Sequence, residues 1–301
     1  MAQTYCTDGR VVWGIALSRL FNEQVERIID LALAEDTSHG DITSQILIPP
    51  EQKGRALIIA RAEGILAGGD VARQVFLRVE PALKVDILIP DGKRVKKGDE
   101  IITIAGSVAG ILKAERVALN FLSHLSGVAS ETARYVSRIE DFAAVITDTR
   151  KTLPSLRVLE KYAVRLGGGQ NHRLNLGDGI LIKDNHIAAL RQTGMSLGDI
   201  IAKAKKNVPD GIKIEIEVNT FAEAMEAAAA GADIVMLDNM TPDEMKRVVE
   251  VKSGWVELEA SGGINLDSVC AVAMTGVDFI SVGAITHSAR ALDFSLELEP
   301  S

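Results

Sequence analysis

Hydrophobic residues in the second half of the chain occur in short runs that alternate with amphipathic stretches. The segments between the runs, such as TFAEAMEAAAAGA (220–232) and TPDEMKRVVEVK (241–252), carry apolar residues at helical spacing. Six runs have the length of β-strands: AAVITDTR (143–150), GILIKDN (179–185), KIEIEVN (213–219), DIVMLDN (233–239), VELEASGG (256–263) and DFISVGA (278–284). This alternation predicts parallel strands with helical crossovers, in a barrel or in an open doubly wound sheet.

The spacing of these strands is regular. Glu217 lies 21 residues before Asp238, Asp238 lies 23 before Ser261, and Ser261 lies 21 before Val282. One strand-helix unit is therefore used repeatedly, without the shared residue signature of a solenoid.

The N-terminal part of the chain has a different pattern. Apolar residues from Val25 to Leu33 fall at helical spacing and are followed by the polar, turn-rich EDTSHGDITS (35–44), so we expect a helix that ends in a loop. Residues 55–64 and 82–107 contain β-like runs with turn signals at Asp91-Gly92 and Gly98-Asp99, which predict a small, mostly antiparallel sheet. Residues 112–140 read as one long helix or two joined helices.

Composition limits the class of protein. The 301 residues are 47% hydrophobic and 25% charged, which is typical of one large or two ordinary globular domains. A sequence pI of about 5.3 argues against a nucleic-acid partner. The apolar run VVWGIAL (11–17) is too short to span a bilayer, so we expect no membrane partner. Cys6 and Cys270 are in no metal or redox spacing, and we interpret them as structural residues of a reducing, cytoplasmic environment.

Positive charge gathers locally in this acidic chain. Between Asp148 and His186 there are seven lysines and arginines against four acids, within a chain of net charge -8. Cations that converge in a cleft form an anion site, whereas cations spread along a helix only solvate its outer face.

The ends of the predicted strands favour the cleft, because each run finishes in polar or glycine residues. These are Arg150 and Lys151, Lys183 and Asp184, Glu217 and Asn219, Asp238 and Asn239, Ser261 with Gly262 and Gly263, and finally Gly283. In barrels of parallel strands, active sites are built at this carboxyl edge.

Three features at this edge suggest ligand chemistry. The small residues of ASGGI (260–264) and SVGAIT (281–286) suit a phosphate site after the last two strands. Glu217 and Asp238 could bind Mg²⁺ or grip ribose hydroxyls. His172 lies beside the GGG run, where a flexible loop could fold cations over a small anion.

Seven segments, in order along the chain, form a recognisable set: EDTSHGDITS, ERVALNFLSHLSG, TDTRKTLPSLRVLEKYAVRLGGGQNHR, LIKDNH, IEIEV, VMLDN and EASGGI. They resemble the corresponding segments of quinolinate phosphoribosyltransferases, also called carboxylating nicotinate-nucleotide pyrophosphorylases. The resemblance extends from about residue 23 to residue 298, and its most specific block is residues 147–186. EDTSHGDITS is a family marker to which we assign no role.

The resemblance implies a fold and a reaction. The fold is an α/β structure in which an N-terminal open-faced α/β sandwich (23–129), to which 288–301 return, joins an incomplete parallel barrel of about six strands (130–287). The reaction joins quinolinate to phosphoribosyl pyrophosphate, releases pyrophosphate and CO₂ and leaves nicotinate mononucleotide, a step of de novo NAD synthesis.

The resemblance also implies residue roles. Lys151, Glu217 and Asp238 are the expected catalytic residues, with Glu217 and Asp238 binding ribose and the cofactor Mg²⁺. Arg116 is expected to reach the barrel of a second subunit, which implies a homodimer or higher oligomer with shared sites. The quinolinate pocket is expected to comprise Thr149, Arg150, Lys151, His172, Arg173 and Lys183. The 5-phosphate is expected at Ser261, Gly262, Gly263, Val282, Gly283 and Ala284.

Three other interpretations remain. A molybdenum-associated paralogue would keep the fold and take another acceptor, although an acceptor without two carboxylates would not need the full set of cations. A Schiff-base aldolase would use Lys183 on a barrel strand. A non-catalytic nucleotide or metabolite sensor would bind ligand without turnover.

Overall fold

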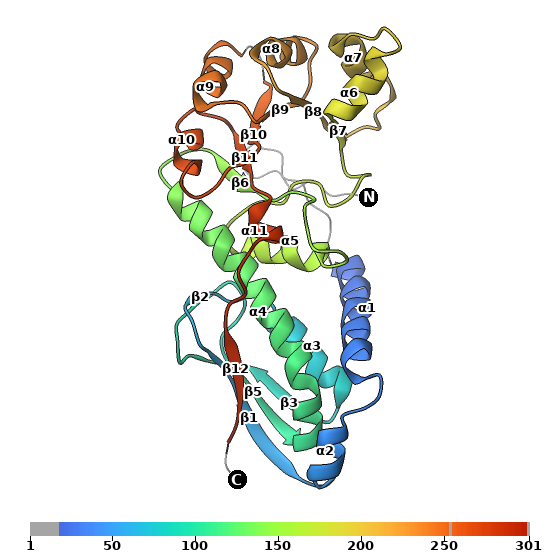
Figure 1. The fold of residues 1–301 in the computed structure, drawn as a ribbon, viewed down its shortest axis with the longest axis vertical. Helices are drawn as coiled ribbons and strands as arrows, with labels where there is room; N and C mark the ends of the chain where they lie inside the picture. The colour runs from blue at the N-terminus through green and yellow to red at the C-terminus, as the bar shows by residue number, and fades with distance from the viewer. Residues whose placement is uncertain (1–17, 253–254, 300–301) are drawn as a thin grey trace.

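Helix α4 (Val108–Arg138) joins the two halves of an elongated molecule (Figure 1). The structure, a computed structural model, describes residues 18–252 and 255–299. The apolar run at 11–17 and Cys6 lie outside these residues. A small antiparallel sheet lies at one end of α4 and a parallel sheet lies towards the other (Figure 1). Residues 112–140, expected as one or two helices, therefore belong to one continuous helix as far as Arg138.

The N-terminal sheet is antiparallel and packs one face against helices. Its strands, in spatial order, are β12 (Phe294–Leu298), β1 (Lys53–Ala60), β5 (Glu100–Ser107) and β3 (Lys84–Ile87). Along β1, Ala56, Ile58 and Ala60 are buried and alternate with more exposed residues, as expected when one face is covered. Helices α3 (Gly69–Val79) and α4 lie on this sheet (Figure 1), which confirms the open-faced sandwich.

The remaining elements of this half include one confirmed helix and two additions. Helix α1 (Ser18–Thr37) buries Val25, Ile29 and Leu33 at a spacing of four residues, as predicted. The predicted loop after α1 contains a second helix, α2 (Ile42–Leu47), whose N-cap Asp41 accepts a hydrogen bond from the Ser44 amide. Helix α3 is also an addition to the predicted elements. A short strand pair, β2 (Gly64–Ile65) and β4 (Arg94–Val95), completes this half.

All six predicted parallel strands are present. They pair in parallel in the spatial order β6 (Val145–Thr147), β11 (Phe279–Ser281), β10 (Glu257–Ser261), β9 (Ile234–Asp238), β8 (Ile214–Val218) and β7 (Ile180–Ile182). In the described part of the chain the end strands β6 and β7 do not pair with each other, so the barrel is incomplete, as expected.

At least one helix follows each of these strands in the chain. The helices are α5 (Arg157–Leu166), α6 (Asp184–Arg191), α7 (Leu197–Asn207), α8 (Phe221–Ala229), α9 (Pro242–Val251), α10 (Val269–Ala273) and α11 (Ala284–His287). The two predicted by spacing, α8 and α9, each begin after a threonine N-cap, at Thr220 and Thr241. No helix among the described residues is long and apolar enough to cross a membrane.

The glycine run 167–169 does not form the flexible loop that we expected. A Cβ atom on Gly167 would lie 2.4 Å from the Ala129 carbonyl oxygen, and one on Gly169 would lie 2.8 Å from a methyl carbon of Thr132. Glycine is needed here because the chain passes directly against α4. The run is therefore a packed segment and not a flexible loop, and it fixes the start of the segment that carries His172.

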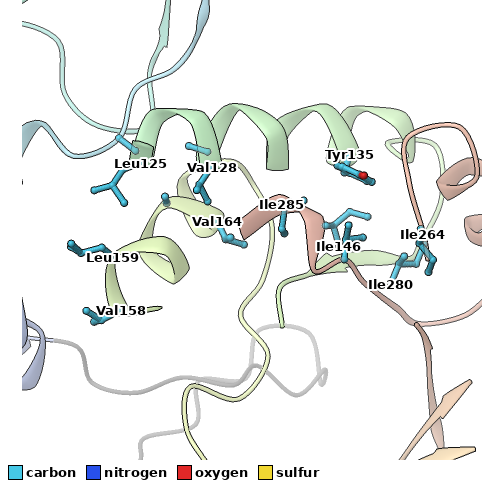
Figure 2. Packing of buried hydrophobic residues seen from close by; sticks show 14 of the residues in the cluster. Leu125, Val128, Tyr135, Ile146, Val158, Leu159, Val164, Ile264, Ile280 and Ile285 are labelled. Carbon is cyan, nitrogen blue, oxygen red and sulfur yellow. The ribbon is translucent and has the colours of Figure 1, made fainter. Parts of the chain in front are cut away.

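The hydrophobic core continues from one half into the other. Figure 2 shows Leu125, Val128 and Tyr135 of α4 in the same cluster as Leu159 and residues of the parallel sheet. The predicted domain boundary between residues 129 and 130 falls within α4, and buried residues on both sides belong to one cluster. Strand β12 brings the C-terminal segment back beside β1.

Candidate active site

Most of the predicted site residues line one cavity of about 440 Å³ at the carboxyl ends of the parallel strands. The predicted residues at this cavity are Thr149, Arg150, Lys151, His172, Arg173, Lys183, Glu217, Asp238, Ser261, Gly262 and Gly263. Their sequence separation of up to 114 positions is bridged by the parallel order of the strands, which aligns all the carboxyl ends at one edge.

A buried ionic network joins two of the cation-bearing segments. The Asp148 carboxylate, at the end of β6, accepts hydrogen bonds from the His172 amide at 2.9 Å, from the Asn171 side chain at 2.6 Å and from the Lys161 ammonium. Lys161 also donates to the His172 carbonyl at 3.0 Å. Since Asp148, Lys161 and His172 are buried, the network holds the start of segment 148–151 against segment 171–173.

The local excess of positive charge therefore has two roles. Arg150, Lys151, Arg173 and Lys183 line the cavity, whereas Lys161 and Arg157 organise the loops around it. The Arg157 guanidinium donates to the Leu174 carbonyl at 3.2 Å, to the Arg150 carbonyl and to the Thr152 hydroxyl. Arg165 is exposed on α5.

Two arginines converge on the cavity. Burial and the neighbouring Arg150 charge lower the pKa of Arg173 from its ordinary value, which still leaves a permanently charged group. The Nε atoms of Arg150 and Arg173 are buried and donate to no protein acceptor among the described residues. Paired guanidiniums with unused donors suit a ligand that carries carboxylates.

Strands β7, β8 and β9 bring one lysine and two carboxylates to the cavity. The Lys183 ammonium, just after β7, donates to the Glu217 carboxylate of β8 at 2.9 Å. Asp238, the last residue of β9, accepts a hydrogen bond from the side-chain amide of Asn239 at 2.6 Å. Glu217 and Asp238 both line the cavity, opposite in charge to the arginines.

The small residues after β10 bring backbone close to the same cavity. Gly262 has φ of +95°, and a Cβ atom there would lie 2.3 Å from the side-chain oxygen of Asn239. Only glycine fits such a position without displacement. Of the residues expected near the phosphate after β11, Val282 is buried, and a Cβ atom on Gly283 would lie 3.1 Å from Lys151. Neither these two nor Ala284 lines the cavity.

Arg116 lies elsewhere in the chain. It is exposed on α4 and lines a second, separate cavity of about 390 Å³ together with residues of α1, including Leu31 and Glu35. The structure of one chain therefore does not bring Arg116 to the main cavity.

Two buried glutamates beside His172 were not predicted. Glu215 of β8 accepts a hydrogen bond from His172 Nε2 at 2.8 Å, and a Glu259 carboxylate oxygen of β10 lies 3.6 Å from the same nitrogen. All three side chains are at least 94% buried. The alternating glutamates of IEIEV and ELEAS are a signal that could have found them, because alternate residues of a barrel strand point to the interior.

Comparison with protein families agrees with this geometry. The model for the quinolinate phosphoribosyl transferase C-terminal domain matches residues 128–297, and the model for the N-terminal domain of the same family matches residues 41–126. The chain belongs to the quinolinate phosphoribosyltransferase family.

Individual members of this family are similar over most of their length. A protein of Bacillus subtilis named probable nicotinate-nucleotide pyrophosphorylase [carboxylating] is 41% identical, with 91% of this chain and 93% of the relative covered. A Nicotiana tabacum relative named quinolinate phosphoribosyltransferase [decarboxylating] 2a, mitochondrial, is 38% identical, with coverages of 90% and 81%. A solved structure of nicotinate-nucleotide pyrophosphorylase from Francisella tularensis is 41% identical and superimposes with a TM-score of 0.87, covering 92% of this chain and 97% of that one.

The quinolinate phosphoribosyltransferase resemblance implied Mg²⁺, and the donor set at the cavity fits this ion. Glu217 and Asp238 supply carboxylate oxygens, the ligand type that Mg²⁺ prefers, and Mg²⁺ commonly takes one or two carboxylates together with substrate phosphates. One Glu217 oxygen is engaged with Lys183. The pair could thus hold a magnesium ion through the remaining carboxylate oxygens.

Proposed function

We propose that this enzyme transfers the phosphoribosyl group of phosphoribosyl pyrophosphate to quinolinate and decarboxylates the product to nicotinate mononucleotide, in de novo NAD biosynthesis. The observation that carries the proposal is one cavity in which a cluster of cations faces two carboxylates and a glycine-rich strand end. Cations suit the two adjacent carboxylates of quinolinate, and the other groups suit a sugar phosphate.

Quinolinate occupies the cationic side. Arg150 and Arg173 grip its carboxylates through planar guanidiniums, and His172 adds a third cation. Thr149, Lys151 and Lys183 complete this side of the cavity. A substrate held this way presents its ring nitrogen at a fixed place. The entropy cost of bringing the reacting atoms together is then met on binding and no longer adds to the barrier of the chemical step.

Phosphoribosyl pyrophosphate occupies the opposite side. Glu217 and Asp238, which both line the cavity, hold the ribose hydroxyls. When bound at these carboxylates, Mg²⁺ neutralises charge on the pyrophosphate. The 5-phosphate lies at Ser261, Gly262 and Gly263, with Val282, Gly283 and Ala284 close behind.

The chemistry requires no protein nucleophile. The anomeric C–O bond breaks, its electron pair leaves with pyrophosphate, and the carboxylates of Glu217 and Asp238 stabilise the positive charge that develops on the sugar. The quinolinate nitrogen then forms the new bond. Its positive charge stabilises the carbanion left at the neighbouring carbon when CO₂ departs, and this carbon takes a proton from water. Lys151, between the two substrates, offsets the negative charge of both.

Arg116 completes the site of a second subunit in this proposal. The side chain is exposed on α4, beside the apolar groove that includes Leu31, itself 68% exposed. A surface of this kind supports burial against another copy of the chain, as a homodimer or a higher oligomer with shared sites.

A cytoplasmic location is part of the proposal, and it rests on cysteine usage. Cys270 forms no disulfide within the described residues. The word mitochondrial in the name of the tobacco relative describes that protein. Fractionation of cells that express the native chain tests the cytoplasmic location proposed for this one.

A discontinuous assay tests the reaction. The protein is incubated with quinolinate, phosphoribosyl pyrophosphate and Mg²⁺, and nicotinate mononucleotide is quantified, with nicotinate in place of quinolinate as the control. Absence of product with quinolinate would refute the proposal and favour a sensor or a paralogue with another acceptor. Borohydride trapping of Lys183 with a carbonyl substrate would favour an aldolase, although Lys183 already donates to Glu217.

A further inference from the structure

The interior of the barrel carries a cluster of charge that begins at the cavity and continues beneath it. The cluster consists of His172, Glu215 and Glu259, from three different segments of the chain. His172 and Glu259 line the cavity, whereas Glu215 lies behind them and does not. Two buried carboxylates are costly to maintain without a function or a cation, so their position beside one histidine requires an explanation.

We propose that Glu215 and Glu259 are positioning residues that hold the His172 ring in one orientation and keep it a cation, so that it acts as a fixed part of the quinolinate clamp. This inference rests on the proposed function, because it assigns partners to His172, which the proposed function places against quinolinate. It adds two residues to the site, on strands β8 and β10.

The hydrogen-bond geometry supports an orienting role. His172 Nε2 is 2.8 Å from Glu215 and 3.6 Å from Glu259, so both carboxylates approach the same ring nitrogen. The backbone of His172 is also held at both ends, since its amide donates to Asp148 and its carbonyl accepts from Lys161. Ring and backbone are thus both fixed before a ligand arrives.

The charges around the ring support the cationic form. Burial alone lowers the pKa of His172, but the charges of Glu259 and Glu215 and the hydrogen bond to Glu215 outweigh burial and raise it to about 9, with Lys161 opposing them weakly. Burial and the Glu215 charge raise the pKa of Glu259 to about 7, partly offset by His172. Asp148, from the end of β6, adds to the negative surroundings of Glu259.

A metal ion fits the same three groups less well. Ligand atoms that share a tetrahedral ion at about 2.0–2.1 Å lie roughly 3.3–3.4 Å apart, which exceeds the hydrogen-bond distance of 2.8 Å between His172 and Glu215. A direct hydrogen bond also needs the proton that a metal would displace.

The test compares isosteric variants of the purified enzyme. Glu259→Gln removes one charge from the cluster, and Glu257→Gln is the matched control, because it removes the same charge from the same face of β10 two residues earlier. Quinolinate affinity is measured by calorimetry at pH 6 and pH 8, and phosphoribosyl pyrophosphate affinity and the melting temperature are measured alongside.

The expected effect is specific to quinolinate and to high pH. If the pKa of His172 falls towards its ordinary value near 6.5, Glu259→Gln should bind quinolinate about 10- to 30-fold more weakly at pH 8 and less than about twofold more weakly at pH 6. Phosphoribosyl pyrophosphate affinity and the Glu257→Gln control should stay within about twofold of wild type. Combined with His172→Ala, Glu259→Gln should cause no further loss.

Three results would overturn the inference: unchanged quinolinate affinity in Glu259→Gln, an equal loss in Glu257→Gln, or an equal loss at both pH values. Glu215→Gln provides the same test if Glu259→Gln does not fold. Failure of the proposed function is separate, because it appears in wild type as no turnover of quinolinate, or in His172→Ala as full quinolinate affinity.

Discussion

Removal of the Lys161 ammonium should destabilise the protein strongly and in a pH-dependent way. Lys161 is 3% exposed, and its partner Asp148 is fully buried. Lys161→Met keeps the length of the side chain but leaves the Asp148 carboxylate buried with no cation and the His172 carbonyl without its donor. Loss of one partner from such a pair costs about 3–5 kcal/mol, which corresponds to a fall of roughly 6–15 °C in Tm.

The pH dependence has a definite sign. Burial already raises the pKa of Asp148, and loss of Lys161 should raise it further above its unfolded value near 3.9. The folded variant then binds more protons than the unfolded chain, so its stability increases as pH falls. The free energy of unfolding, measured by urea denaturation at pH 8 and pH 5.5, should show a smaller deficit relative to wild type at pH 5.5.

Two variants serve as controls for this prediction. Lys84→Met breaks an exposed pair with Asp86 and should change stability by less than about 0.5 kcal/mol. Lys161→Met combined with Asp148→Asn has no buried charge to protonate, so the pH-dependent part should disappear. A deficit below about 1 kcal/mol, or one independent of pH in Lys161→Met alone, would refute the view of this pair as a buried ionic anchor.

Three further predictions concern the reaction. Quinolinate should be used at least about 10- to 100-fold more efficiently than nicotinate, because cations left without the second carboxylate stay unpaired; comparable kcat/KM values would contradict this. Inactive Arg116→Ala and Lys151→Ala proteins, mixed under subunit exchange, should recover about a quarter of wild-type activity, and no recovery despite proven exchange would place Arg116 in its own chain's site. Glu217→Ala or Asp238→Ala should lower kcat/KM for phosphoribosyl pyrophosphate on the order of 10²-fold while quinolinate binding is retained or tightened; near-normal turnover would remove these residues from the sugar half of the site.

The local pattern of the sequence was sufficient for the six parallel strands and for their carboxyl ends. Short apolar runs such as those of β8 and β9, followed by helices with threonine N-caps, predict parallel strands from local sequence alone. Because such strands end at one edge, the polar residues after each run, from Arg150 to Ser261, could be assigned to a common site. The sequence also carries the pattern of helix α3, because Val71, Val75 and Phe76 follow helical spacing. We did not predict this helix, although its local sequence was sufficient for it.

Tertiary structure decided which charged residues face the cavity and which support it. Lys161 and Arg150 are both cations of one segment, yet Lys161 is buried against Asp148 and Arg150 lines the cavity, because α5 packs against α4 and turns Lys161 inward. The partnership of His172 with Glu215 and Glu259 joins residues 43 and 87 positions apart.

The glycine run shows the same limit to what local sequence can predict. Gly167 to Gly169 indicate either freedom or close contact, and only the position of α4 distinguishes the two. Local sequence specifies backbone conformation because propensity and periodicity act over a few residues. Burial of a charge or contact with a distant helix depends on packing between segments far apart in the chain, and therefore only the folded structure determined these features.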